Sequence, residues 1–502
     1  MSLLLFLVVA LAAGAASLVV HRERLISGAI GIAGLVVTSL LATRVGNGDI
    51  LQVGGVQLLG TDYLRLFLTL GSIVGLLTTL LALATTWSVA LPGSWLVVLA
   101  GSGLALALSD PIAAAASTTV GALAGVIVTL GPVPTGAGLG VARRELRALV
   151  AACVLGIGAA GIASSQSAIA LDPAVVGLAF IAFVAGAAIR LGSIPFHLWV
   201  ARAADTAPSV GLPLVMAWAP AGFVAVTLAW LNTSILPLGE SLSVERAVIL
   251  LVAATTIVIA SAVATLHEDL EHIVGYSIVA DGAVALLGLA VLDPAAWGLT
   301  RTWLITFALA KTGFAAWVAA VHYSYGARQL GELDGWARRS PVLGLALLAV
   351  FAASIGLPGM ANLDAHLRLV RLALPEPLAA GLLVLSVVSL GYYLRLAITG
   401  LRSPGASVAS GADPAPRLRR PARTPGSRAA RGASRQFATT LAILRENRAP
   451  IAAVLVLAVS GLAVIVAAGG FGIEQAAEAA RPVPALPVGF NQDNPVSASP
   501  EP

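Results

Sequence analysis

"AIRLGSIPFHLWV", residues 188–200, is an apolar run that a glycine and a proline interrupt, with ionisable side chains on both sides of the interruption. The segment "ASIGLPGMANLDAHLRLV", residues 353–370, repeats this design in the second half of the chain. Proline removes a helical hydrogen bond, and backbone groups freed in this way are tolerated inside a membrane only where protein or water covers them. Paired interrupted segments in two halves are typical of transporters built from inverted repeats. The sequence therefore predicts a membrane protein with a broken helix in each of two halves.

The composition indicates that most of the chain lies in lipid. Of 502 residues, 58% are hydrophobic and 11% are charged, and the mean hydropathy is +0.94, whereas soluble domains carry roughly 25% charged residues. A membrane-spanning helix needs about 20 apolar residues. We therefore expect an all-α polytopic membrane protein with about fourteen spans, near residues 3–20, 25–43, 63–86, 92–108, 111–131, 148–165, 173–194, 209–231, 246–265, 273–292, 300–322, 341–358, 378–398 and 449–469.

The chain divides into six predicted parts. Its basic segment near the C-terminus is rich in Pro, Ser, Ala, Gly and Arg and has no apolar period, which is typical of disorder. The parts are N-terminal transmembrane helices (1–90), a first repeat (91–235), a second repeat (246–400), a disordered basic cytoplasmic loop (401–448), a last transmembrane helix (449–469) and a flexible tail (470–502).

The placement of arginine predicts the topology, because arginine is in excess in cytoplasmic loops. The first apolar stretch lacks a basic leader and is followed directly by "HRER", so we read it as a first span and not as a cleaved signal. We place the N-terminus outside. The cytoplasmic side then holds Arg22, Arg24, Arg202, Arg338, Arg339, the "ARRELR" loop at 142–147 and the basic loop at 402–448.

Ionisable side chains within the predicted spans are the main candidates for function. A charge at the centre of a bilayer costs roughly 2.5–3.5 kcal/mol on insertion scales, so such residues are rare without a role. Lys311, in the middle of "LITFALAKTGFAAWVAAV" (304–321), is the only lysine of the chain. The candidates for a proton path are Lys311, Asp281, Asp364, His366, Arg190 and His197, with Glu271, His272 and Arg368 as secondary candidates.

Several of these residues also have simpler interpretations. Glu271 and His272 could be solvated residues at a loop end, and Arg368 could extend to the membrane interface. His197 could be a structural hydrogen-bonding group beside the first break. Asp110, which precedes a proline, is best explained as the start of a helix.

Other chemistries have no support in the sequence. Cys153 is the only cysteine, so neither an internal disulfide nor a thiolate metal site is expected. The motifs of ATP hydrolysis, zinc peptidases and nucleophilic triads are absent from the sequence. We expect no bound metal or cofactor. Nucleic acid is not an expected partner, because the basic residues lie mostly in short loops between spans.

Five segments, in order, resemble the antiporter-like membrane subunits of respiratory complex I (NADH-quinone oxidoreductase subunits N, M and L), of Mrp cation/proton antiporters and of membrane-bound hydrogenases. The last segment is most typical of subunit N. The resemblance implies a fold of two inverted five-helix repeats whose broken helices are the seventh and twelfth spans. The segments are "RLGSIPFHLWVARAADTAPSV" (190–210), "HEDLEHIVGYSIVADGAVALLGLA" (267–290), "FALAKTGFAAW" (307–317), "RRSPVLGLALLAVFAASIGLPGMANLDAHLRLV" (338–370) and "SVVSLGYYLRLAITG" (386–400).

In that family, proton transfer is attributed to a Glu–Lys pair in the first half, a central lysine, and a lysine or glutamate on the twelfth span. The resemblance places Arg190 at the seventh-span lysine and Lys311 at the central lysine. It places His197 at the histidine of the family's "PFH" motif and His366, or nearby Arg368, at the twelfth-span position.

This sequence departs from the family pattern at several charged positions. The fifth-span glutamate should fall at 118–120, but no carboxylate lies between Asp110 and Glu145. The eighth-span lysine should fall near Pro220 or Ala221, where "VMAWAPAGF" has no charge, and Asp281 stands where the family has histidine. Because arginine holds its proton at nearly any pH, an arginine in the first half is a poor proton relay.

Three functional hypotheses remain. The chain is expected to be a non-redox membrane subunit of a complex I-like assembly, taking part in proton or cation translocation coupled to electron transfer. The alternatives are a non-pumping structural subunit that supports assembly and an Mrp-type cation/proton antiporter subunit. The expected location is the plasma membrane of a prokaryote. The expected partners are other membrane subunits and the lipid bilayer, with any quinone near the complex and not bound by this chain.

Overall fold

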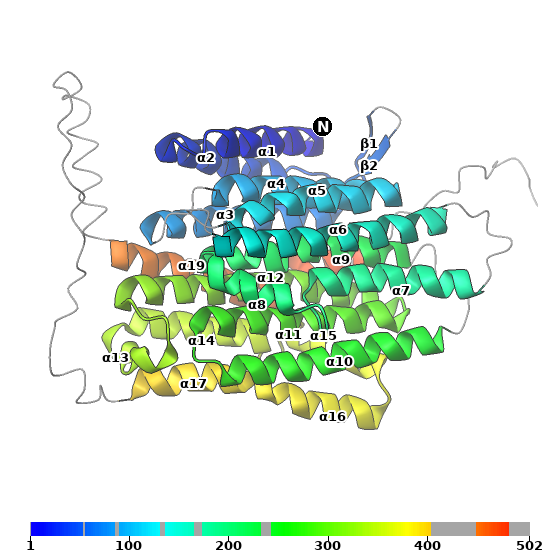
Figure 1. Cartoon of the computed structure of the whole chain (residues 1–502). Helices are drawn as coiled ribbons and strands as arrows, with labels where there is room; N and C mark the ends of the chain where they lie inside the picture. The colour runs from blue at the N-terminus through cyan, green and yellow to red at the C-terminus, as the bar shows by residue number, and fades with distance from the viewer. Residues whose placement is uncertain are drawn as a thin grey trace, which may run out of the picture.

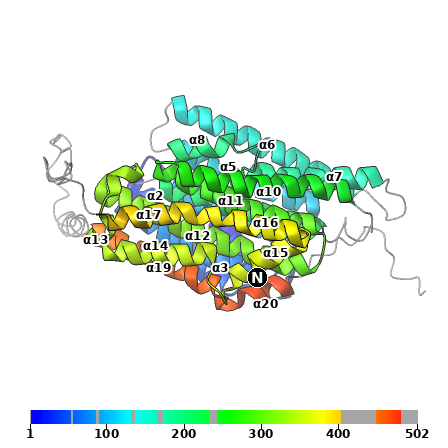
Figure 2. The same cartoon turned by 90° about the horizontal axis from the view of Figure 1, so that it is seen from below.

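The computed structural model describes residues 2–53, 56–85, 90–130, 136–164, 173–231, 242–402 and 448–480. Long helices lie side by side with their axes roughly parallel, as the two views in Figures 1 and 2 show. The N-terminal part begins this bundle and carries a short antiparallel hairpin in which Ile50 pairs with Leu59. Its elements are α1 (Ser2–Val19), α2 (Arg24–Ala42), β1 (Ile50–Val53), β2 (Val56–Leu59) and α3 (Asp62–Ala84).

The next part runs through the first break and ends in a span that contains one π-helical turn. As expected, Asp110 begins a helix: its Oδ1 accepts a hydrogen bond from the backbone N–H of Ala113 at 2.6 Å. The elements are α4 (Leu91–Ala107), α5 (Pro111–Thr129), α6 (Gly136–Ser164), α7 (Pro173–Arg190), α8 (Leu198–Thr206), η1 (Ser209–Gly211), η2 (Leu214–Trp218) and α9 (Ala219–Trp230).

The second half contains the longest helix, α12, and the second break. Its elements are α10 (Ser243–Leu266), α11 (Leu270–Val291), α12 (Ala295–Tyr325), η5 (Leu330–Leu333), α13 (Trp336–Arg339), α14 (Pro341–Ile355), α15 (Ala361–Ala373), α16 (Glu376–Ser386), η6 (Val387–Ser389) and α17 (Leu390–Leu401). The C-terminal elements are α19 (Arg448–Ala467), η7 (Gly470–Gly472) and α20 (Ile473–Ala479).

The prediction of an all-α polytopic membrane fold is confirmed. Within the described residues, 11 helices are long and apolar enough to cross a membrane, or 12 if the bent pair at 330–355 counts as one span. The helices α4 and α7 are apolar but shorter. The expected count of about fourteen spans is therefore not confirmed.

Both predicted helix breaks are present, and each depends on a glycine. α7 ends at Arg190 and α8 begins at Leu198, with Gly192 at φ +66° between them. α14 ends at Ile355, where Gly356 has φ +79° and a side-chain Cβ there would lie 2.6 Å from the Cβ of Leu363. Residues with a Cβ atom rarely adopt these positive φ values, whereas glycine does so readily, so glycine permits both breaks.

Helix α12 is the central element of the fold. It contacts helices from every part of the chain, among them α3, α11, α14, α15, α19 and α20. An apolar stretch of 18 residues in α12 is fully buried, whereas only about a third of the corresponding stretch is buried in α1 and in α19. A charged side chain in the middle of α12 therefore meets protein, not lipid.

The structure corrects two details of the predicted organisation. The "ARRELR" stretch is not a loop, because it lies within α6. The predicted flexible tail is ordered at its beginning: α20 packs on α3 and α12 with Ile473 and Ala477 buried. The backbone carbonyl of Ala477 accepts a hydrogen bond of 3.3 Å from buried Arg301 of α12. Residues 403–447 of the predicted basic loop and residues 481–502 of the tail lie outside the described residues.

Candidate functional site

The centre of the candidate site is an ion pair between α11 and α12. Lys311 Nζ lies 2.7 Å from Asp281 Oδ2. The Lys311 side chain is 0% exposed and that of Asp281 is 16% exposed. Two of the charged residues that the sequence singled out separately are thus brought together, and the carboxylate neutralises the charge of the buried ammonium group.

Two tyrosines of α17 complete the surroundings of Lys311, and sequence reasoning did not assign them a role. Lys311 Nζ donates a hydrogen bond of 3.4 Å to the hydroxyl of Tyr392. The hydroxyl of the adjacent Tyr393 donates a hydrogen bond of 2.7 Å to Ser354 Oγ of α14. Both tyrosines are buried, so hydroxyl groups replace water around the ammonium group.

A cavity of about 200 Å³ lies on the Asp281 side of the ion pair. Its lining includes Asp281, Tyr392 and His366, the last from the helix that follows the second break. Trp303 connects these groups, because its Nε1 donates a hydrogen bond of 2.9 Å to the backbone oxygen of Asp281 and its ring lies 5.1 Å from the His366 ring. The cavity is large enough for several water molecules, which occupy about 30 Å³ each.

Asp364 and Arg368 do not join this site. They form an exposed ion pair of 3.2 Å along α15, and neither residue lines the cavity. Of the three candidates predicted on this helix, only His366 faces Asp281.

Arg190 occupies a different place, at the end of α7. Its guanidinium donates hydrogen bonds to the Thr118 backbone oxygen at 3.3 Å and to Thr119 Oγ1 at 2.6 Å, and it lies 4.3 Å from the ring centroid of Phe223. A threonine hydroxyl therefore contacts this cation in the stretch where the family resemblance led us to look for a carboxylate. His197 stands at the N-cap of α8, partly buried, and its Nδ1 has no hydrogen-bond partner among the described residues.

Glu271 and His272 belong to a polar cluster at the start of α11. His272 lies 3.1 Å from Asp269 and 3.3 Å from Asp205, and Glu271 lies 3.3 Å from His322. The cluster joins α8, α11 and α12.

The loop between α10 and α11 adds His267 to this cluster. Its ring stacks on that of His272 at 4.9 Å. Burial and the neighbouring His272 charge lower the pKa of His267. These contacts make the predicted loop-end residues a partly buried network.

The fold and the site together define a polytopic membrane protein with broken helices and an intramembrane acid–base pair. Residues 158–390 match the family described as "NADH:quinone oxidoreductase/Mrp antiporter, TM". The resemblance seen in the sequence is confirmed, and the matched region contains both Asp281 and Lys311.

Individual relatives carry names of this family, and solved structures share the fold. NADH-quinone oxidoreductase subunit N 2 of Rhizobium meliloti (strain 1021) is 28% identical over 233 residues, which are 45% of this chain and 47% of that protein. The chain thus matches about half the length of such relatives. Its fold is similar to that of a chain of the Mrp complex from Dietzia sp. DQ12-45-1b (TM-score 0.71, 22% identity, covering 96% of this chain and 97% of that one). A chain of Thermus thermophilus respiratory complex I with bound NADH gives a TM-score of 0.70 at 18% identity, covering 96% and 100%.

Proposed function

We propose that this protein is a membrane subunit of a multi-subunit, complex I-like assembly and that it takes part in proton translocation. The observation that carries the proposal is the buried ion pair between Lys311 and Asp281 beside a cavity. Burying two charges costs several kcal/mol per ion before their attraction is counted, and two apolar residues of similar size often stabilise a protein at least as well as such a pair. A purely structural contact between α11 and α12 has no need of such a pair.

The geometry gives the two residues different parts in proton transfer. Asp281 lines the cavity and Lys311 does not, so a proton that enters the cavity reaches the carboxylate before the lysine. Protonation of Asp281 would leave Lys311 as an unpaired cation in a fully buried position, which is strongly unfavourable. The charge states of the two groups are therefore linked, and the hydroxyl of Tyr392, 3.4 Å from Lys311 Nζ, offers an acceptor beside the ammonium group.

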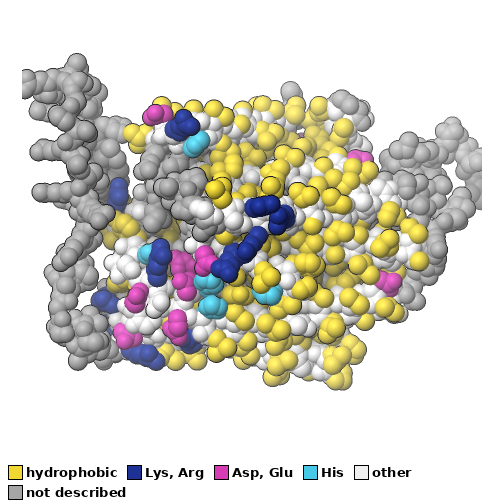
Figure 3. All heavy atoms as spheres, in the orientation of Figure 1, with side chains coloured by type: hydrophobic (Ala, Val, Ile, Leu, Met, Phe, Trp, Pro, Cys, Tyr) yellow, Lys and Arg dark blue, Asp and Glu magenta, His cyan; other side chains and the backbone are white. Residues whose placement is uncertain are grey.

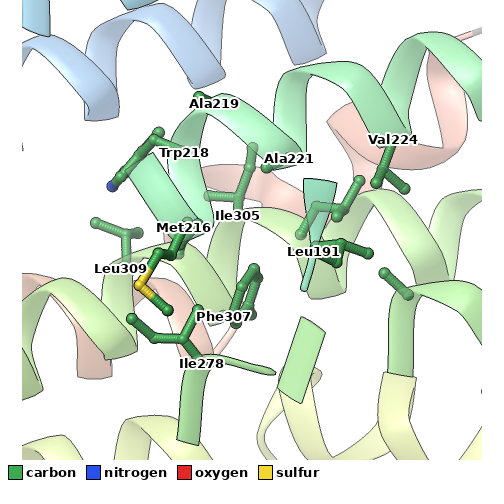
Figure 4. Close-up of a cluster of buried hydrophobic side chains, with 14 of the residues drawn as sticks. Leu191, Met216, Trp218, Ala219, Ala221, Val224, Ile278, Ile305, Phe307 and Leu309 are labelled. Carbon is green, nitrogen blue, oxygen red and sulfur yellow. The ribbon is translucent and has the colours of Figure 1, made fainter. Parts of the chain in front are cut away.

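An apolar cluster limits the proposed path to the second half. Figure 4 shows Met216 of the first half next to Ile278 and Phe307 of α11 and α12, with Leu191 and Trp218 in the same apolar cluster. Ala221, where the family resemblance led us to look for a lysine, belongs to this cluster and is 0% exposed. Because proton transfer needs polar groups or water, we propose that protons do not pass directly between the halves.

The arrangement of charge supports the proposed orientation in a prokaryotic plasma membrane. Figure 3 shows that charged side chains on the visible face gather toward one end of the bundle, while apolar side chains cover most of the rest. The helices α8 and α13, which contain Arg202, Arg338 and Arg339, lie toward that end in Figure 1. Following the positive-inside rule, we propose that this end lies in the cytoplasm and that the N-terminus lies outside.

A non-pumping structural subunit is the second candidate. The observation that favours it is the first half, where arginine replaces the expected lysine and an apolar cluster replaces the polar connection. In that case the buried ion pair would fix the packing of α11 against α12 without exchanging protons. An Mrp-type cation/proton antiporter subunit is compatible with the same fold and differs in its partners.

The test compares Lys311→Ala and Asp281→Asn with Asp364→Asn in the assembled complex. The control changes an exposed carboxylate that lies outside the cavity. We expect the first two variants to lose proton movement in proteoliposomes while the complex retains its subunits, and the control to keep it. Normal proton movement in both ion-pair variants would instead favour the structural role.

A further inference from the structure

The helix α6 carries a buried carboxylate that the sequence did not reveal. Glu145 is 2% exposed and lies on the same face of α6 as Ala142, Leu149 and Ala152, all of which are buried. Its Oε2 accepts a hydrogen bond of 2.8 Å from Thr129 Oγ1 at the end of α5. This side chain therefore points into the protein, although it stands between arginines in the sequence.

Glu145 shares a cavity with Arg190. The cavity lies between α5, α6, α7 and α9, and Trp199, Ala122 and Pro220 also line it. The space open to the centre of a water molecule is about 10 Å³, which is room for about one water. A carboxylate and a guanidinium thus line one small, otherwise apolar cavity, far along the chain from the Lys311–Asp281 pair.

The charges that surround Glu145 leave its own charge without direct compensation. Within the described residues no cation lies within 4.0 Å of the carboxylate. The arginines on α6 itself, Arg143, Arg144 and Arg147, are exposed. On the packed neighbours, Arg190 of α7 donates to Thr118 and Thr119 of α5, and Arg202 of α8 is paired with Asp205 at 3.7 Å.

The arginine of this cavity also has unused hydrogen-bonding capacity. Arg190 is 2% exposed, and its Nε has no partner among the described residues. A buried polar group of this kind usually binds a water molecule. The cavity that Glu145 and Arg190 both line has room for such a water.

Only one of the two charged groups is suited to exchange a proton. Arginine keeps its proton at nearly any pH, so Arg190 supplies a fixed positive charge. A buried carboxylate with a single hydroxyl donor is costly as an anion, and a bound proton removes that cost. The hydrogen bond from Thr129 Oγ1 opposes this effect, because it stabilises the anion.

We propose that Glu145, held by Thr129 and facing Arg190 across the cavity, is a second, separate proton-binding site of this protein. The ligand is a proton delivered by water. The cavity at Glu145 and the cavity beside the Lys311–Asp281 pair have no lining residue in common, so protons reach the two sites by separate routes. It does not depend on the function proposed above, because a proton can bind there whether or not the assembly pumps.

Infrared difference spectroscopy tests this site without any measurement of transport. The full chain, purified in its complex and reconstituted in liposomes, is compared at acid and alkaline pH. A protonated carboxyl group has a C=O band that its anion lacks. An Asp281→Asn background removes the contribution of the other site, and Glu376→Gln, an exposed carboxylate on α16, is the matched control.

We expect Glu145→Gln to remove one band that the control retains. Thr129→Val should keep this band but shift it to higher frequency, because the hydrogen bond that weakens the C=O bond is lost. The second variant alters no charge, so it serves as a test even if Glu145→Gln fails to fold. A spectrum that is unchanged in either variant would overturn the proposal.

Discussion

The sharpest prediction concerns the Lys311–Asp281 pair and uses a double-mutant cycle. At 2.7 Å, the attraction of two unit charges at an effective dielectric constant of about 20 is about 6 kcal/mol. Desolvation cancels part of this, and removing one partner of a buried pair costs about 3–5 kcal/mol in practice. Asp281→Asn retains an oxygen that can accept a hydrogen bond from Lys311 Nζ. We therefore expect a loss of about 3 kcal/mol in unfolding free energy, at the lower end of that range.

The double variant Asp281→Asn/Lys311→Met separates stability from function. It removes the unpaired cation and fills its place with an apolar side chain of similar length, and replacements of this kind are often neutral or stabilising. We expect its stability to return to within about 1 kcal/mol of the wild type, judged from the neutral end of such replacements, while proton movement stays absent. Denaturant unfolding and a pH-sensitive dye in proteoliposomes measure the two quantities.

Two outcomes would refute this reasoning. If the double variant regains proton movement together with stability, the pair holds α11 against α12 and does not carry protons. If the double variant is as unstable as the single one, the ion pair is not the source of the lost free energy, and the electrostatic account of the site fails.

The remaining predictions concern the break, the cavity and the surface. Gly356 has φ +79° and ψ +142°, so Gly356→Ala should cost about 1–3 kcal/mol from backbone strain alone, and more from its close contact with Leu363. Gly381→Ala, which meets no atom within 4 Å, should not measurably lower the Tm. Trp303→Phe removes the hydrogen bond to the Asp281 backbone, so we expect a loss of about 1 kcal/mol and slower proton movement, measured by unfolding and by the same dye. Asp364→Asn breaks an exposed ion pair and should change stability by under about 1 kcal/mol; a larger loss in denaturant unfolding would contradict its placement outside the site.

The sequence identified the members of the site better than their arrangement. The breaks followed from local chemistry, because glycine and proline act on the residues next to them. Lys311 and Asp281 were both recognised as costly charges, but 30 positions separate them in the sequence, and only the packing of α11 on α12 pairs them. The two tyrosines of α17 were missed for the same reason.

Helix geometry explains the remaining errors. Successive residues of a helix are about 100° apart, so Asp364 and His366 lie on nearly opposite sides of α15, although they are close in sequence. For Glu145, the surrounding arginines indicated a loop. The useful signal was the spacing of 142, 145, 149 and 152, which follows one face of a helix and makes the carboxylate part of a buried stripe.

The apolar cluster between the two halves has a consequence for how they cooperate. A hydrogen bond of 3.0 Å from Trp218 Nε1 to Thr312 Oγ1 crosses the junction next to Lys311. The indole N–H can donate but not accept, so this contact fixes the position of α12 without passing a proton. A change in charge at Lys311 can still act on the first half through packing and through its electric field, which is strong where water is excluded. Any cooperation between the Glu145 site and the Lys311–Asp281 pair therefore takes the form of coupled charge states, with the protons of each half exchanging on its own side of the cluster.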